Sequence, residues 1–319
     1  MKILITGGAG FIGSHLCDYL IKENNHVVVV DNLSLGKEEN IKHLLNNKNF
    51  KFYKQEILDN KGMREIFTKE KFDIVFHLAA NSDIAKSRLD PSVDFNNTFM
   101  TTYTVLNLMK EFNVKKLVFA STSAIYGETT TVLNENYGPL FPVSLYGAAK
   151  LASEGFITAF GENYGIQVWI TRFPNVIGER ATHGVILDFI KKLKANPKEL
   201  TVLGNGEQNK PYIYVKDLVE AIIYVWTHSN EKINCYNIGV ETRTKVKDIA
   251  RMTIKEMNLD ATIKYSGGDR GWIGDVPEFK YDLTKIHALG WKAKFTSDEA
   301  VLKSVKYILQ QLEERRNKK

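Results

Sequence analysis

The segment 2–14, with the sequence KILITGGAGFIGS, constrains the fold more than any other part of the chain. Residues 2–6 form a short apolar run, the pattern of a buried parallel strand, and residues 11–21 have the amphipathic pattern of a helix. Glycines separate the two, and the helix would begin with unpaired N–H groups and the positive end of its dipole. This arrangement is typical of the phosphate-binding corner of a dinucleotide-binding fold. The residues expected at this corner are Gly7, Gly10, Phe11, Ile12 and Gly13.

A carboxylate at the end of the next strand indicates which dinucleotide binds. The apolar run 26–30 ends in Asp31, which can accept the adenosine ribose hydroxyls. A 2′-phosphate about 5 Å away would be repelled by roughly 3 kcal/mol per charge at an effective dielectric near 20. The chain continues Asn32, Leu33, Ser34, without an Arg to hold such a phosphate. The sequence therefore predicts NAD rather than NADP.

Composition excludes several other classes of function. Of the 319 residues, 44% are hydrophobic and 25% charged, as in ordinary globular proteins, and the net charge is only +6. The basic cluster Arg315, Arg316, Lys318 and Lys319 is expected to be a solvated helix end, so we expect no nucleic-acid partner. No apolar run reaches membrane-spanning length, and a strand beginning at residue 2 leaves no room for a signal peptide, so we expect a cytoplasmic protein without a membrane partner. No His, Cys or Asp cluster has metal-ligand spacing, and no metal is expected.

The order of apolar and amphipathic segments predicts an α/β fold, a Rossmann-type doubly wound parallel sheet with a smaller interleaved α/β domain. Further strands are expected at 50–53, 74–78, 117–121 and 168–173, with helices at 40–45, 61–67, 97–112 and 146–164. After Arg172 the rhythm changes, and the runs 212–214 and 235–238 are candidates to rejoin the main sheet. We therefore expect a cofactor domain over 1–172 plus about 213–240, and a substrate domain over 173–212 and 241–319.

The candidate chemistry lies in LVFASTSAIYG (117–127) and SLYGAAKLASE (144–154). Tyr146 and Lys150 stand at i and i+4 of one predicted helix, so their side chains share a face. Free tyrosine has a pKa of ~10, and lowering it to near 7 takes about 4 kcal/mol of charge stabilisation. Lys150 and the positive nicotinamide of NAD⁺ can supply it. Thr122, at the end of its strand, can hold the same substrate hydroxyl as Tyr146.

Seven segments in order resemble the extended short-chain dehydrogenase/reductases that modify nucleotide sugars: TGGAGFIGSHL, VVDNLSLG, FHLAA, STSAIYG, SLYGAAK, RFPNVIG and GNGEQNKPYIYVKDL. Within that nucleotide-sugar epimerase/dehydratase family, the chain is most similar to the UDP-glucose (UDP-galactose) 4-epimerases. The resemblance implies that Thr122, Tyr146 and Lys150 are catalytic. Tyr146 would take the sugar O4 proton while C4 gives a hydride to NAD⁺, and the 4-ketose would turn over and take the hydride on its other face.

The resemblance also implies binding residues, with some departures from the family pattern. Beyond the glycine corner, Asp31, Tyr146 and Lys150, the cofactor set is Asn32, Ser34, Gly36, Glu56, Ile57, Leu78, Ala79, Ala80, Asn97, Ser121 and Phe173. The substrate set is Ser82, Thr122, Asn175, Val185, Lys210, Tyr212, Arg270 and Asp275. Met100 replaces the Gly of an Asn-x-x-Gly-Thr motif, Glu56 replaces an Asp, and Lys210 replaces an Arg, which keeps the charge but loses the bidentate fork. The segment GDRGWIGD has two extra residues, and Phe279 after it is expected to border the sugar.

Several functions remain open at this point. The first is C4 epimerisation of UDP-glucose and UDP-galactose, and the alternatives are a UDP-glucuronate or a GDP- or CDP-sugar epimerase. A 4,6-dehydratase would need an Asp-Glu pair after Thr122, where this chain has Ser123 and Ala124. An NADPH-dependent keto-sugar reductase is disfavoured by Asp31.

Two structural expectations complete the interpretation. His77 is expected to be a satisfied residue at a strand end rather than an acid. A homodimer is expected, because the helices 97–112 and 146–164 carry more aromatic residues than one inner face requires. In the resembled family such helices pair across a twofold axis.

Overall fold

The structure, a computed structural model, describes residues 1–317 apart from 83–86, 88 and 273, and it divides into two compact units. Lys318 and Lys319 of the basic tail lie outside the described residues. Unit 1 consists of Met1–Gly127, Gly138–Arg172 and Ile222–Tyr236. Unit 2 consists of Glu128–Tyr137, Phe173–Ala221 and the chain from Asn237 onward. Residues 128–137, 213–221 and 237–240 thus fall in unit 2, whereas we expected them in the cofactor domain.

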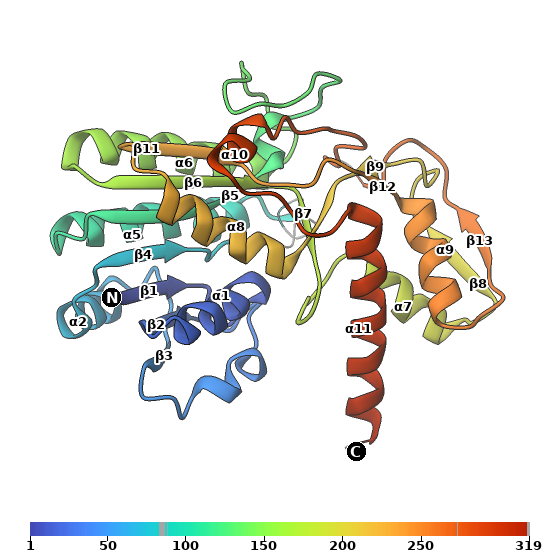
Figure 1. Ribbon diagram of the computed structural model, residues 1–319, viewed down its shortest axis with the longest axis horizontal. Helices are drawn as coiled ribbons and strands as arrows, with labels where there is room; N and C mark the ends of the chain where they lie inside the picture. Colours follow the sequence, from blue (N-terminus) through green and yellow to red (C-terminus); the bar gives the residue numbers. More distant parts are fainter. Residues whose placement is uncertain (83–86, 88, 273, 318–319) are drawn as a thin grey trace. The chain divides into compact units, whose positions relative to one another are not determined.

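Unit 1 is built on a seven-stranded sheet with the order β11-β6-β5-β4-β1-β2-β3 (Figure 1). β1 pairs in parallel with both β2 and β4, so the strand order reverses at β1, where open α/β sheets bind ligands. This confirms the predicted doubly wound sheet. The strands are β1 (Lys2–Thr6), β2 (His26–Asp31), β3 (Phe50–Lys54), β4 (Ile74–His77), β5 (Lys116–Thr122), β6 (Gln167–Phe173) and β11 (Ile233–Asn237).

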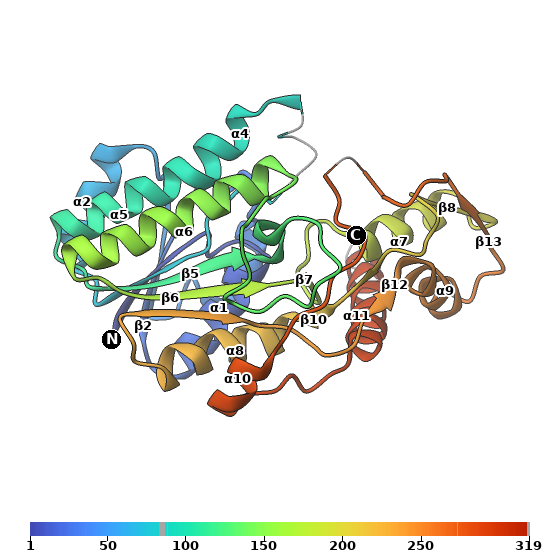
Figure 2. The same cartoon turned by 90° about the horizontal axis from the view of Figure 1, so that it is seen from above.

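Helices cover both faces of this sheet. Figure 2 shows α2 (Asn60–Glu70), α5 (Thr101–Glu111) and α6 (Leu145–Tyr164) on one face, and α1 (Phe11–Lys22) on the other. The last turns of α8 (Val215–His228), from Ile222 onward, also belong to unit 1, where Trp226 packs edge-on against Phe76 of β4 at 5.3 Å between ring centroids. Side chains of α2, α5 and α6 form one apolar core with those of the strands.

Two helix predictions in unit 1 need correction. Residues 40–45 are not an α-helix but two 3₁₀ turns, η1 (Glu38–Asn40) and η2 (Lys42–Leu44), and Asn40 uses its side chain to donate to Ala9 O at 3.0 Å. Such side-chain bonds to the backbone compete with regular helix. The expected helix 97–112 begins earlier, with α4 (Ser92–Asp94) and the π-helix η3 (Phe95–Met100) preceding α5. A π-helical turn changes which residues face the core.

Among its described residues, unit 2 contains three two-stranded sheets and four helices of its own. The sheets are β7 (Asn175–Ile177) with β10 (Tyr212–Tyr214), β9 (Asn209–Lys210) with β12 (Thr244–Lys245), and β8 (Glu199–Val202) with β13 (Thr262–Tyr265). The helices are α7 (Val185–Ala195), α9 (Val246–Glu256), α10 (Thr284–Leu289) and α11 (Ser297–Asn317).

The two runs expected to rejoin the main sheet behave differently. β11 does so, but 212–214 pairs with β7 instead, because the Tyr212 N–H is already bound by Ser297 Oγ at 3.1 Å and its register is set by Asn175. Across the described residues, no helix is long and apolar enough to cross a membrane.

Candidate active site

The glycine corner leaves no room for side chains at Gly7 and Gly13. Gly7 has φ +71°, and a Cβ on it would lie 2.8 Å from Ala79 N, while a Cβ on Gly13 would lie 2.3 Å from Gly7 O. Gly10 is the N-cap of α1 and offers no side-chain cap. The backbone after β1 therefore lies directly against the residues after β4, with the first turn of α1 beside it, which is the form of a diphosphate cradle.

Asp31 is buried next to that corner. Its Oδ2 accepts from Ala9 N at 3.0 Å and its Oδ1 from Leu33 N at 2.8 Å. Burial raises the pKa of Asp31, and the two backbone bonds oppose the rise. No described Lys or Arg forms an ion pair with it, so a 2′-phosphate here would meet a carboxylate without a compensating cation.

The other residues predicted for the cofactor lie at the same edge of the sheet. Asn32 donates to Glu56 Oε2 at 2.6 Å, which joins the ends of β2 and β3, and a Cβ on Gly36 would lie 2.7 Å from the Asp31 carboxylate. Leu78, Ala79 and Ala80 follow β4, Ile57 is buried after β3, and Ser34 is exposed. Asn97 is exposed on the π-helix, and Phe173 ends β6 as the first residue of unit 2.

Tyr146, Lys150 and Thr122 come together between β5 and α6. Ser144 caps α6 by accepting from Gly147 N at 3.0 Å, which places Tyr146 in the first turn. The side chain of Thr122, the last residue of β5, acts on the Tyr146 hydroxyl and opposes the rise in its pKa. Lys150 is 2% exposed, and its Nζ donates to Ala120 O at 2.6 Å and lies 6.0 Å from the centroid of the Tyr146 ring. The three predicted catalytic residues therefore share one site.

The electrostatics of this site differ from the simple expectation for tyrosine. Burial lowers the pKa of Lys150 to about 7, and the negative charges of Glu154 and Asp94 oppose that fall. Burial and Asp94 raise the pKa of Tyr146, and the hydrogen bond with Thr122 lowers it. The chain alone thus favours a phenol, and a tyrosinate base requires the positive nicotinamide ring as well.

Sequence reasoning missed an ion pair beneath this site. Glu154 accepts from Arg172 NH2 at 2.6 Å and from Nε at 3.1 Å, and also from Ser121 Oγ at 2.5 Å. Arg172 NH1 in turn donates to Tyr126 Oη at 2.9 Å. Glu154 follows Lys150 by one helical turn on the same face of α6, and that spacing was a signal for its burial. The pair ties β5, β6 and α6 together.

Asp94 is a second residue that sequence reasoning missed. It is 1% exposed, and its charge acts on both Tyr146 and Lys150. No sequence signal could identify it, because the π-helix that follows breaks the helical periodicity.

His77 is a satisfied residue, as expected. Its Nδ1 is hydrogen-bonded to Thr6 Oγ1 at 2.7 Å and its Nε2 to Thr102 Oγ1 at 3.0 Å. Burial lowers its pKa to about 3, so the ring is neutral at physiological pH.

Most residues predicted for the substrate belong to unit 2. Lys210 and Asp275 form a buried ion pair, and Gly271 N donates to Asp275 Oδ2 at 3.2 Å. Arg270 NH2 donates to Glu128 Oε2 at 2.7 Å. Both cations expected at a diphosphate are therefore held by carboxylates. Tyr212 is buried in β10, Asn175 is exposed in β7, Val185 begins α7, and Ser82 in unit 1 is exposed after β4.

Two further predicted positions have defined surroundings. Phe279 is 6% exposed and packs edge-on against Tyr281 at 5.5 Å, so its place at the sugar stays a prediction. Ser123 and Ala124 open the 3₁₀ turn η4 (Ser123–Tyr126), in which Ala124 N donates to Thr122 Oγ1 at 3.1 Å.

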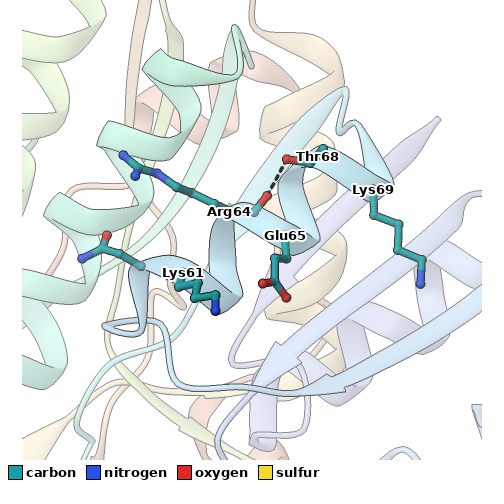
Figure 3. Close-up of a pocket in the computed structure, with 6 residues that line it drawn as sticks. Lys61, Arg64, Glu65, Thr68 and Lys69 are labelled. Carbon is teal, nitrogen blue, oxygen red and sulfur yellow. Dashed lines mark hydrogen bonds between the residues drawn. The ribbon is translucent and has the colours of Figure 1, made fainter.

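A surface hollow on α2 has none of this chemistry. Figure 3 shows Lys61, Arg64, Glu65, Thr68 and Lys69 along it. All of them are exposed, and the Thr68 hydroxyl donates to the Arg64 backbone at 2.8 Å. This is a solvated helix face. Among the residues that the structure describes, no group of His, Cys, Asp and Glu side chains is placed to hold a metal ion.

The sequence pattern of the NAD dependent epimerase/dehydratase family matches residues 3–239. The chain belongs to this family. NAD is the cofactor of the epimerase/dehydratase family, and the glycine corner and the unpaired Asp31 carboxylate fit it. The residues that would hold NAD in this family member are the corner, Asp31, and the segments after β3 and β4.

Relatives of this epimerase/dehydratase include enzymes of more than one activity. A putative UDP-glucose 4-epimerase of Methanocaldococcus jannaschii is 32% identical, over 96% of this chain and 98% of the relative. The crystal structure of a Thermotoga maritima UDP-glucose 4-epimerase with UDP-glucose is 34% identical, with a TM-score of 0.88 over 98% of this chain and 100% of that one. That of a Bacillus cereus UDP-glucuronic acid 4-epimerase with UDP-glucuronic acid and NAD is 29% identical, with a TM-score of 0.87 over 98% and 100%. Relatives named dTDP-D-glucose 4,6-dehydratase also match.

Proposed function

We propose that this enzyme interconverts UDP-glucose and UDP-galactose by epimerisation at C4. The observation that carries the proposal is the meeting of Thr122, Tyr146 and Lys150 at the end of β5, with no carboxylate in the two positions after Thr122. This set can move one proton at a sugar hydroxyl and has no further acid or base to eliminate a second one.

The roles of the side chains follow from their chemistry. Thr122 and Tyr146 hold the sugar O4, and Tyr146 takes its proton as C4 is oxidised. NAD, held by the glycine corner and Asp31, would supply the hydride acceptor for C4 and the hydride donor for the 4-keto sugar. Tyr146 then returns the proton to O4, so the reaction is a net isomerisation without consumption of cofactor. The Lys150 ammonium, next to the Tyr146 ring, favours the tyrosinate form during this exchange.

A dehydratase is disfavoured by the same turn. Elimination of the C6 hydroxyl requires an acid and a base beside the reacting sugar, and the residues after Thr122 are Ser123 and Ala124. Thr122 caps this turn, and its Oγ1 accepts from the Ala124 N–H at 3.1 Å. The relatives that carry the dehydratase name therefore do not determine the reaction of this chain.

Residues of unit 2 support the proposal that the substrate carries a nucleoside diphosphate. Lys210 and Arg270, which pair with Asp275 and Glu128 in this structure, are two cations that suit a diphosphate, and the Asp275 carboxylate suits a ribose. The UDP-sugar names of the similar epimerases agree with this chemistry. Phe279 is a bulky residue in the loop expected to border the sugar, and close-packed pockets resist added volume such as an N-acetyl group.

A panel of nucleotide sugars, incubated with the protein without added NAD, tests the proposal. We expect UDP-galactose to be converted to UDP-glucose, with a kcat/KM above that for UDP-N-acetylgalactosamine and for UDP-glucuronate. Phe279→Ser is expected to raise the relative kcat/KM for the acetylated sugar. Conversion of UDP-glucuronate alone, or release of a 4-keto-6-deoxy sugar, would overturn the proposal.

A further inference from the structure

Asp94 is a buried carboxylate in unit 1 whose charge no ion pair with a described residue balances. It ends α4 and is 1% exposed. Its Oδ1 accepts from Asn81 Nδ2 at 2.9 Å and from Thr98 Oγ1 at 3.4 Å. Its Oδ2 has no hydrogen-bond partner within the described part of the chain. Because a buried, unpaired carboxylate is costly, a positive charge nearby has to offset it.

Lys150 has the complementary property. Its ammonium is 2% exposed, donates to Ala120 O and lies 4.5 Å from the Phe119 ring, but no described carboxylate is within ion-pair distance. Its helix α6 packs against η3, the π-helix that continues directly from Asp94. The charge of Asp94 raises the pKa of Lys150 and also that of Tyr146.

The remaining charged groups described around the pair are already compensated. Glu154 raises the pKa of Lys150 more than Asp94 does, but both of its oxygens are already bound by the Arg172 guanidinium. His77 on β4, whose pKa is about 3, is neutral. The described part of the site therefore contains two uncompensated opposite charges, those of Asp94 and Lys150.

We propose that Asp94 is a positioning residue that acts as the counter-charge of the Tyr146–Lys150 pair. Its carboxylate holds Lys150 as an ammonium in the interior and biases Tyr146 toward its phenol form, so it sets the pH range in which the pair works. The proposal rests on the proposed function only in taking Tyr146 and Lys150 as the proton-handling pair, and it does not depend on the identity of the sugar.

The first test is the pH profile of kcat/KM for the holoenzyme with Asp94→Asn. Removal of a negative charge lowers the pKa values of both Tyr146 and Lys150, so both limbs of the profile move to lower pH, by about one unit. Asp90→Asn, at an exposed position of the same segment, is the matched control and is expected to leave the limbs in place. If Asp94→Asn lowers kcat/KM at every pH but leaves both limbs at the same pH, Asp94 has a structural role only, and the proposal is overturned.

The second test needs no turnover and therefore separates Asp94 from the proposed reaction. Urea unfolding of Asp94→Asn, of Lys150→Met and of the double variant gives a double-mutant cycle for the folding equilibrium constant. If the two charges interact, the factor by which the double variant lowers this constant is expected to be at least tenfold smaller than the product of the two single factors. The matched cycle of Asp31→Asn with Lys150→Met is expected to be additive, because Asp31 is buried on β2 and does not act on Lys150. Additivity in the Asp94 cycle would overturn the proposal.

Lys150→Met alone provides a further measurement if Asp94→Asn does not fold. Without the ammonium, the buried Asp94 carboxylate loses its counter-charge, and this loss costs more as the carboxylate ionises. The variant therefore loses stability relative to the wild type as the pH rises from 5 to 8. A difference in stability that does not change with pH would contradict the proposed pairing.

Discussion

At the residue scale, the proton chemistry that we propose for this enzyme depends on one phenol oxygen, that of Tyr146. Tyr146 meets Thr122 through its hydroxyl, and its ring lies 6.0 Å from the Lys150 ammonium. Ring and hydroxyl can therefore be separated by mutation.

Tyr146→Phe is expected to lower kcat by about 10²–10⁴-fold, because it removes the proton-transfer group and leaves the ring in place. NAD bound to the purified protein, measured by mass analysis after denaturation, is expected to be unchanged and to contain no NADP. Turnover near that of the wild type would remove Tyr146 from the mechanism.

The ion pair beneath the site belongs to the same scale. Glu154→Gln leaves the buried Arg172 guanidinium without its counter-charge, and we expect a loss of about 3–5 kcal/mol in the free energy of unfolding. Glu162→Gln on the same helix is the control. Its partner Lys232 is exposed, and the expected loss is below about 1 kcal/mol. Urea unfolding measures both, and equal losses would contradict the account.

At the element scale, two glycines in the corner between β1 and α1 are expected to have different roles. A Cβ on Gly13 would lie 2.3 Å from Gly7 O, whereas a Cβ on Gly10 would have only one close neighbour, at 3.0 Å. Gly13 serves the packing of helix on strand, and Gly10 serves the approach of the backbone to a phosphate.

We therefore expect Gly13→Ala to lower the unfolding temperature of the NAD-free protein and Gly10→Ala to leave it nearly unchanged. Both are expected to weaken NAD binding, because Gly10 sits at the start of α1. Thermal unfolding with and without NAD distinguishes the two effects. A Gly13→Ala protein as stable as the wild type would show that the corner can relax.

The elements that sequence predicted well are those whose patterns are local. β1 to β6 are short apolar runs, and Tyr146 and Lys150 are four residues apart in one helix. The sequence alone therefore predicted the strands and the shared helix face of this pair. The 3₁₀ turns at 38–44 and the pairing of 212–214 with β7 depend on tertiary hydrogen bonds of Asn40 and Tyr212. The π-helix before α5 has no local sequence pattern that distinguishes it from an α-helix. The burial of Asp94 follows from the same π-helix, so no spacing rule could reveal it.

At the scale of the whole molecule, an aromatic face on unit 1 supports assembly. Phe95, Tyr103 and Phe156 are 55%, 36% and 42% exposed, and Phe99 joins them at 5.9 Å from Phe95 and 5.1 Å from Phe156. A contiguous exposed apolar patch of this kind marks an interaction surface. We propose that a second copy of the chain covers it.

We expect a dimer by light scattering at micromolar concentration and a monomer for Phe156→Glu. Phe141→Glu, at a 73% exposed position outside η3, α5 and α6, is the control and is expected to remain dimeric. A monomeric wild type would refute the dimer.

The chain passes several times between the two units, and this limits which parts of the protein can be exchanged by recombination between related genes. The chain passes from one unit to the other after Gly127, Tyr137, Arg172, Ala221 and Tyr236. No single crossover between two genes can therefore exchange the unit that carries Lys210 and Asp275 as one block. A crossover after Arg172 would exchange Lys210 and Asp275 together, but it would also exchange Ile222–Tyr236 of unit 1, so the incoming segment would have to fit the sheet of the recipient.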